Sequence, residues 1–141
     1  GQTMRTLSEL LFNQNPLTLA MDARVKDACR EMCARRVGSI LVVDDDGCLV
    51  GIFTGRDAVR RVLAAGKGAD TKLRDVMTPN PDVLSPNQTG IDGLRLMWDG
   101  GCRHLPVVDG GKLVGVASHG DFKSDEQARL DEERSIWEHV R

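Results

Sequence analysis

An internal repeat constrains the fold of this chain more than any other feature of its sequence. At an offset of 65 residues, segment 15–19 aligns with 80–84, both beginning with Asn-Pro, and the Val-Val-Asp run at 42–44 aligns with 107–109. The following turn is one residue shorter in the second copy, so the Leu-Val-Gly run at 49–51 aligns with 113–115 at an offset of 64. Two copies of one supersecondary unit therefore build the fold together.

Both copies predict the same order of elements. An extended piece follows Asn-Pro (LTL and DVL), because proline disfavours a helix there. A helix is expected near 23–36 and near 88–100, where apolar residues recur at helical spacing. Two apolar strands follow on either side of a glycine-containing turn: SILVVD with CLVGIFT, and HLPVVD with KLVGVAS. A second helix, GRDAVRRVLAAG in the first copy, ends near Gly66. The unit is β-α-β-β-α.

One such unit is too small to bury both faces of its sheet and its helices. The repeat therefore predicts an α/β fold of the α+β type, in which two β-α-β-β-α copies pack sheet against sheet about an approximate two-fold axis. We expect a first domain at 8–66, a second at 70–124 and a C-terminal helical tail at 125–141, in which Trp137 could dock on the module or on a second subunit. The linker GKGADTKLRDVMTP suits a connection over the surface.

Composition limits the class of protein. Of 141 residues, 40% are hydrophobic and 28% are charged, as in ordinary globular proteins, and the net charge of -2 argues against nucleic acid as a partner. No apolar run is long enough to cross a bilayer and no secretory pattern begins the chain, so we expect a cytoplasmic protein that does not bind membranes. The four cysteines lack the spacing of a zinc site and are expected to be small buried side chains in a reduced compartment: Cys29, Cys33, Cys48 and Cys102.

One turn is repeated where a strand is followed by a helix. Glycine, hydroxyl and carboxylate are each three residues apart, at Gly51, Thr54 and Asp57 in the first copy, and the second copy has Gly115, Ser118 and Asp121. Hydroxyl and acid at this spacing are close to a capping box, in which the two side chains satisfy backbone N–H groups and contribute about 0.5 to 2 kcal/mol. Capping is therefore one interpretation of both turns.

The second interpretation is a nucleotide site. Unpaired N–H groups at a helix start attract phosphate, and glycine permits close approach to the backbone. A carboxylate one turn inside can accept hydrogen bonds from two neighbouring hydroxyls, which is what a ribose offers. Hydroxyl and helix start would hold phosphate, the aspartate would hold ribose and apolar strand residues would hold the base.

These segments resemble the cystathionine beta-synthase (CBS) domain pair, or Bateman module. The resemblance covers about residues 8–124 and rests on SILVVDDDGCLVGIFTGRD, VMTPNPDVL, RHLPVVD and KLVGVASHGD. It implies adenosine-containing ligands in clefts between the copies, bound by the two Gly-x-x-Thr/Ser-x-x-Asp patterns. It further implies that Thr18, Leu19, Asp82 and Val83 border the adenine and that Ile40, His104 and Pro106 line the cleft. Family members commonly form disc-like homodimers, so a homodimer is expected.

The two copies differ beside this pattern. In the alignment of the two copies, Gly38 and Ser39 correspond to Arg103 and His104. Likewise, Gly55 and Arg56 correspond to His119 and Gly120. An arginine at either place can add a phosphate contact, so the two sites are expected to differ in affinity or in ligand. Arg56 and Arg103 can equally be solvated surface charges, and His119, which adjoins the phosphate position, can be an exposed turn histidine.

The sequence thus favours a stand-alone regulatory or sensor module that is not an enzyme and requires no cofactor. Its regulatory ligand would be AMP, ADP, ATP, NAD(H) or S-adenosylmethionine, and binding would change its shape or oligomeric state and thereby act on an unidentified effector protein. No metal constellation, nucleophile motif or Walker loop occurs in the sequence. Two alternatives stay open: a purely structural dimerisation or docking module, and an enzyme with a nucleotide substrate.

Overall fold

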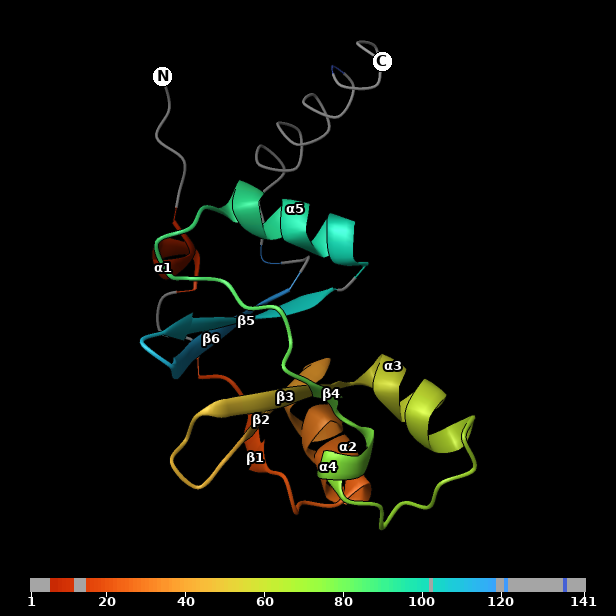
Figure 1. The fold of residues 1–141 in the computed structure, drawn as a ribbon. Helices are drawn as coiled ribbons and strands as arrows, with labels where there is room; N and C mark the ends of the chain where they lie inside the picture. Colours follow the sequence, from red (N-terminus) through yellow and green to blue (C-terminus); the bar gives the residue numbers. More distant parts are fainter. Residues whose placement is uncertain (1–5, 12–14, 102, 119–120, 122–135, 137–141) are drawn as a thin grey trace. The chain divides into compact units, whose positions relative to one another are not determined.

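The structure of the chain is a computed structural model that describes residues 6–11, 15–101, 103–118, 121 and 136 (Figure 1). The chain divides into two compact units. The first-repeat unit consists of Asn15–Asp82 and Gly110–Leu113. The second-repeat unit consists of the described parts of Gly1–Gln14, Val83–Asp109 and Val114–Arg141. Each unit buries its own cluster of apolar side chains.

The first-repeat unit contains a four-stranded sheet in the order β1-β2-β3-β4. Its strands are β1 (Thr18–Ala20), β2 (Ser39–Val43), β3 (Leu49–Thr54) and β4 (Thr78–Pro79). The pair β1 and β2 is parallel, because a helix connects them, whereas the other pairs are antiparallel. The β2–β3 turn is closed by Asp44, whose Oδ1 accepts from the N–H of Cys48 at 2.9 Å. This is the hairpin that the sequence predicts.

Three helical segments accompany this sheet. Helix α2 (Val25–Arg35) turns Val25, Ala28 and Met32 inward at spacings of three and four residues. The short helix α3 (Gly55–Asp57) continues as the π-helical segment η1 (Ala58–Leu63), which ends before Gly66 at a φ of +73°. Helix α4 (Leu73–Val76) lies in the linker between the repeats. The two helices predicted for the first copy are therefore confirmed.

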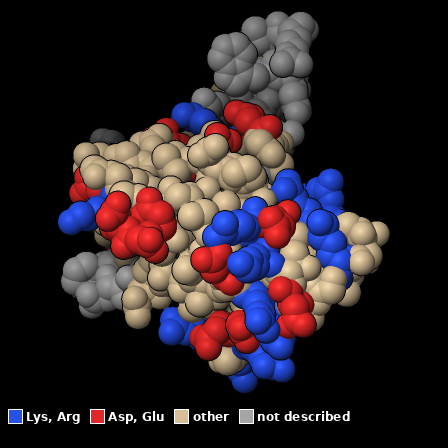
Figure 2. Space-filling view, turned by 60° about the horizontal axis from the view of Figure 1, so that its bottom comes forward, with Lys and Arg blue, Asp and Glu red and all other residues tan. Residues whose placement is uncertain are grey.

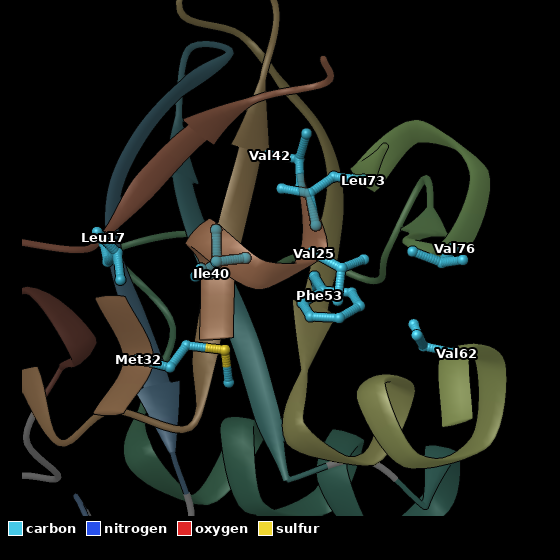
Figure 3. Packing of buried hydrophobic residues seen from close by; sticks show 10 residues of the cluster. Leu17, Val25, Met32, Ile40, Val42, Phe53, Val62, Leu73 and Val76 are labelled. Atoms are coloured by element: carbon cyan, nitrogen blue, oxygen red, sulfur yellow. The ribbon is translucent and has the colours of Figure 1, made fainter. Parts of the chain in front are cut away.

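The core of the first-repeat unit draws on every one of these helices (Figure 3). Phe53 of β3 and Ile40 of β2 have no exposed surface. Leu73 and Val76 of the linker are buried in the same cluster. The expectation of a connection over the surface does not hold for the short apolar turn of the linker, because Leu73 and Val76 are spaced to bury one face of a helical turn. The buried members of the cluster are Leu17, Val25, Ala28, Met32, Ile40, Val42, Phe53, Val62, Leu73 and Val76.

The second-repeat unit contains α1 (Leu7–Leu10), α5 (Gly90–Gly100), β5 (His104–Asp109) and the part of β6 (Lys112–Ser118) from Val114 onward. Strands β5 and β6 form a hairpin. Leu84 forms a parallel bridge with Val107. This bridge is equivalent to the pairing of Leu19 in β1 with Val42 in β2 of the first copy. The core of the unit consists of Leu7, Leu84, Met97, Leu105, Val107 and Ala117. The predicted tail at 125–141, with Trp137, lies outside the described residues except for Ile136.

The short helices α1 and α4 have equivalent positions in the two units. The N–H of Leu7 donates to the carbonyl of Gln88 at 2.8 Å, and the N–H of Leu73 donates to the carbonyl of Ala23 at 2.8 Å. Helix α1 lies before the first Asn-Pro segment but belongs to the second-repeat unit, and α4 lies before the second Asn-Pro segment but packs in the first-repeat unit. The two compact units thus combine segments that are separate in the sequence. The domain bounds 8–66 and 70–124 follow the repeat in the sequence, and they stay a prediction.

Basic and acidic side chains are intermixed over part of the face shown in Figure 2. In the first-repeat unit Asp70 pairs with Lys26 at 3.1 Å, and Asp22 pairs with Lys72 at 3.7 Å and with Arg74. These exposed pairs connect the linker to the β1–α2 segment, and each contributes about 0 to 1 kcal/mol. Over the described part of the chain, no helix has the length and apolar character needed to cross a lipid bilayer.

Candidate functional site

The repeated turn of the first copy lies at the junction of β3 and α3. Thr54 ends the strand in an extended conformation (φ -119°, ψ 169°), and the helix begins at the next residue. The N–H of Asp57 donates to Thr54 Oγ1 at 3.2 Å, while Asp57 Oδ2 accepts from the N–H of Thr54 at 3.0 Å. The capping box that the sequence allows is therefore formed.

The two oxygens of the Asp57 carboxylate have different partners. Oδ2 accepts from both the N–H and the hydroxyl of Thr54, at 3.0 and 3.2 Å. Oδ1 has longer contacts, with the Thr78 hydroxyl at 3.4 Å and with Nε of Arg61 at 3.5 Å. A carboxylate offers about four acceptor positions, so capping through Oδ2 leaves Oδ1 able to accept a stronger hydrogen bond. The capping and ribose interpretations are therefore compatible at Asp57.

Gly51 lies against the chain's own linker. A Cβ built on Gly51 would lie 2.5 Å from Met77 Sδ and 3.0 Å from the carbonyl oxygen of Thr78. Gly51 also pairs with Pro79 across the β3–β4 ladder. The close approach that requires glycine here is therefore that of residues 77–79, and a ligand contact at Gly51 stays a prediction.

The other predicted residues of the first copy differ in burial. Thr18 is exposed and Leu19 half-buried on β1, where they pair with Leu41 and Val42 of β2. Ile40 is fully buried in the core of the unit, and its part in lining a ligand cleft stays a prediction. Arg56 is exposed on α3, as both the phosphate and the surface interpretation require.

The turn of the second copy repeats the main hydrogen bonds of the first. Asp121 Oδ2 accepts from the N–H of Ser118 at 2.6 Å and from its hydroxyl at 2.9 Å. His104 of β5 lies close enough to Asp121 for their charges to interact. Burial lowers the pKa of His104, the Asp121 carboxylate opposes this effect, and Arg103 adds to it. The structure thus brings three predicted site residues of the second copy together.

The remaining predicted residues of the second copy have diverse environments. Gly115 and Pro106 are buried, whereas Arg103 is exposed. Val83 exposes 46% of its surface, and Asp82, which is also exposed, belongs to the first-repeat unit. His119 lies outside the described residues. Ligand contacts by all of these residues stay predictions.

A third turn of the Thr/Ser-x-x-Asp type, Thr89 to Asp92, begins helix α5. The N–H of Thr89 donates to Asp92 Oδ2 at 3.0 Å, and the N–H of Asp92 donates to Thr89 Oγ1 at 3.2 Å. This turn has no glycine three residues before the threonine, where Pro86 stands. It therefore provides an internal example of a capping box without the full repeated pattern.

Two of the cysteine predictions are wrong. Cys33 and Cys48 are exposed, because Cys33 lies on the outer face of α2 and Cys48 lies at the β2–β3 turn. Cys29 is partly buried, and burial, with a smaller effect of Cys33, raises its pKa. Cys102 lies outside the described residues. Among the residues that the structure describes, no three His, Cys, Asp or Glu side chains are grouped so as to hold a metal ion.

Sequence reasoning missed two residues that contact Asp57. Arg61 follows it by four residues, a spacing that places two side chains on one helical face, so this neighbour had a local signal. Thr78 lies 21 residues away in sequence, and only the β3–β4 pairing brings it to the carboxylate. No local pattern predicts that contact.

The sequence of the chain matches known proteins. The family model described as "CBS domain" matches residues 7–64 and 73–124. The chain is 38% identical over 113 residues to CBS domain-containing protein CBSCBSPB2 of Arabidopsis thaliana, covering 79% of this chain and 21% of that protein. It is 38% identical over 104 residues to the uncharacterized protein YlbB of Bacillus subtilis, covering 73% of this chain and 70% of that protein. The chain thus spans about a fifth of the length of the Arabidopsis relative.

A solved structure shares the fold. CBS domain protein PAE2072 from Pyrobaculum aerophilum, solved in complex with AMP, superposes with a TM-score of 0.82 at 25% identity. The match covers 91% of this chain and 99% of that one. The order of elements predicted from the repeat is therefore that of a known fold.

Proposed function

Because the chain belongs to the family of CBS-domain proteins, as a tandem pair, we propose that it is a non-catalytic regulatory module that binds an adenosine-containing ligand. The candidate ligands are AMP, ADP, ATP, NAD(H) and S-adenosylmethionine. Binding in clefts between the two repeats would favour one conformation or oligomeric state, such as a homodimer, and would thereby act on an effector protein.

The observation that carries this proposal is the unequal engagement of the Asp57 oxygens. Oδ2 holds the helix start, whereas the contacts of Oδ1 with described residues are longer, at 3.4 and 3.5 Å. A ribose hydroxyl can donate to Oδ1 without breaking the cap, and a hydrogen bond to a charged group is worth about 1.5 to 3 kcal/mol. The solved relative with AMP bound supports an adenosine ligand for this fold.

The phosphate part of the proposal depends on side chains more than on the helix start. The N–H of Gly55 is directed at the carbonyl of Gly38 at 3.3 Å, and the N–H of Asp57 is directed at Thr54. Two of the first three helical N–H groups are therefore already engaged. Arg56, exposed between them, is the group of this turn that would contact a ligand phosphate.

The two repeats would not bind equally. Arg56 belongs to the first-copy turn, where the second copy has glycine, and Arg103 and His104 belong to the second copy, where the first has Gly38 and Ser39. His104 adds a partly buried imidazole beside Asp121. A calorimetric titration that fits two equal, independent sites would contradict this difference.

The test is a thermal-shift series with AMP, ADP, ATP, NAD+, NADH and S-adenosylmethionine, with GMP as the control for base recognition. A ligand at 100 times its dissociation constant stabilises the folded state by about 2.7 kcal/mol. We expect at least one adenosine compound, and not GMP, to raise the melting temperature. The bound compound should be recovered unchanged after incubation, whereas its turnover would indicate an enzyme.

A structural module without a ligand is the second candidate. It is favoured by one observation, namely that the Thr54–Asp57 capping box is complete without any other molecule. In that case no adenosine compound shifts the melting temperature, and sedimentation still shows a dimer at micromolar concentration.

A further inference from the structure

Arg61 connects the candidate ribose ligand Asp57 to the linker between the repeats. Its Nε lies 3.5 Å from Asp57 Oδ1, and its Nη1 donates to the carbonyl oxygen of Met77 at 3.1 Å. The Asp57 side chain is only 13% exposed, whereas that of Arg61 is 48% exposed. The Arg61 guanidinium thus faces the largely buried Asp57 carboxylate through Nε and is fixed by the Met77 carbonyl through Nη1.

The carboxylate is held from both of its oxygens. Thr54 fixes Oδ2 through its N–H and hydroxyl, and Thr78 and Arg61 approach Oδ1. Without the contacts to Oδ1, the carboxylate plane could turn about the anchored Oδ2. A guanidinium is well suited to this role, because its planar group bonds in fixed directions and loses less freedom than a lysine would.

We infer that Arg61 is a positioning residue of the first-repeat site, one that holds Asp57 Oδ1 in the orientation that accepts a ribose hydroxyl. The inference rests on the proposed function and deepens it. Arg61 acts here through Asp57 and does not itself contact the ligand. Its contribution therefore depends on the ribose hydroxyls and not on the number of phosphates.

The chain supplies a matched control for this role. Arg60 is the neighbouring residue on the same helical segment and is exposed, and among the described residues no ion pair or hydrogen bond of its side chain occurs. Replacing either arginine by methionine removes one positive charge from neighbouring positions of the same helical segment. Only Arg61→Met removes the contacts with Asp57 and Met77. A general electrostatic effect on an anionic ligand would be similar for both variants.

The experiment is isothermal titration of wild type, Arg61→Met, Arg61→Lys and Arg60→Met with adenosine, AMP and 2′,3′-dideoxyadenosine. We expect Arg61→Met to weaken adenosine and AMP by the same factor, about fivefold, which corresponds to a partly exposed ion pair. Arg61→Lys should recover part of this loss, and Arg60→Met should bind like wild type. Dideoxyadenosine should bind weakly to wild type and Arg61→Met alike.

Several results would overturn the inference and leave the proposed function standing. Equal affinities of Arg61→Met and Arg60→Met would do so, as would a loss that is larger for AMP than for adenosine, which would place Arg61 on the phosphate. If Arg61→Met melts at a lower temperature, an Asp57→Asn/Arg61→Met double variant separates the roles, because Arg61→Met should then cause no further loss of affinity. Wild type that binds neither these three compounds nor any adenosine compound of the thermal-shift series would contradict the proposed function itself.

Discussion

Asp57 and Asp92 close the same capping box in different units. Each carboxylate accepts from the N–H of the threonine three residues earlier at 3.0 Å, and each N–H donates back to that threonine's hydroxyl at 3.2 Å. Their surroundings differ, because the Asp57 side chain is 13% exposed and that of Asp92 is 37% exposed. A local Thr-x-x-Asp pattern therefore predicts a cap in both places. An arginine lies near Oδ1 in both, at 3.5 Å for Asp57 and 3.8 Å for Asp92, so the deeper burial and the Thr78 contact distinguish Asp57.

Gly51→Ala should destabilise the first-repeat unit. The added methyl group would lie 2.5 Å from Met77 Sδ and 3.0 Å from the Thr78 carbonyl oxygen, and relieving such overpacking costs about 1 to 3 kcal/mol. Gly55→Ala, four residues along, is the control, because a methyl group added there would meet no atom within 4 Å. Urea denaturation of both variants measures the difference, and equal midpoints would contradict the packing described for Gly51.

Arg36→Gly should stabilise the protein. Arg36 ends α2 in the left-handed region at a φ of 55°, and Gly101 ends α5 in the same conformation at a φ of 67°. A residue with a Cβ is disfavoured by about 1 kcal/mol in this region, so we expect a gain of that order from Arg36→Gly and a similar loss from Gly101→Arg. Thermal or urea unfolding measures both changes. Changes of the same sign in the two variants would contradict this explanation.

Acid should weaken the second-repeat unit through His104. Burial lowers the pKa of His104 below the unfolded value of 6.5, in spite of the Asp121 carboxylate. As the pH falls, the unfolded state therefore takes up the proton first. His104 does not change the free energy of unfolding above about pH 7.5, and it lowers that free energy increasingly as the pH falls through 6.5.

The measurement is the free energy of unfolding of wild type and His104→Gln between about pH 8 and pH 5, the range in which an ordinary histidine titrates. Subtracting the variant removes the contributions of the carboxylates that the two proteins share. We expect wild type to lose more stability than the variant as the pH falls. A wild type that gains on the variant at low pH would contradict the effect of burial on His104.

Much of the fold could be predicted because its signals are local and occur twice. The Asn-Pro segments, the glycine turn and the apolar spacing of α2 and α5 indicate the order of elements in each copy. The positions of α1 and α4 could not be predicted in the same way, because Leu7 and Leu73 are buried by segments other than their sequence neighbours. Short helices of one turn also have little periodicity to detect.

The local contacts of the candidate site could be predicted from the sequence, whereas its contacts with the linker could not. Thr54 and Asp57 follow from spacing within one turn, and Arg61 lies four residues further on. Thr78 and Met77 enter only through the pairing of β4 with β3, which depends on the course of the linker. The phosphate role of the helix start stays a prediction, and the bond from the N–H of Gly55 to the carbonyl of Gly38 is a contact that the spacing of the turn does not indicate.

The central claim is that Asp57 caps its helix through Oδ2 and leaves Oδ1 for the ligand. Asp57→Asn tests it most directly, because the amide oxygen can keep the bond to the Thr54 N–H while the amide nitrogen replaces the accepting oxygen by a donor. Asp92→Asn makes the same change in the capping box of α5. Calorimetric titration of both variants with the adenosine compound that stabilises wild type should show affinity at the first-repeat site reduced about tenfold or more in Asp57→Asn and unchanged in Asp92→Asn. Wild-type affinity in a folded Asp57→Asn variant would contradict the claim.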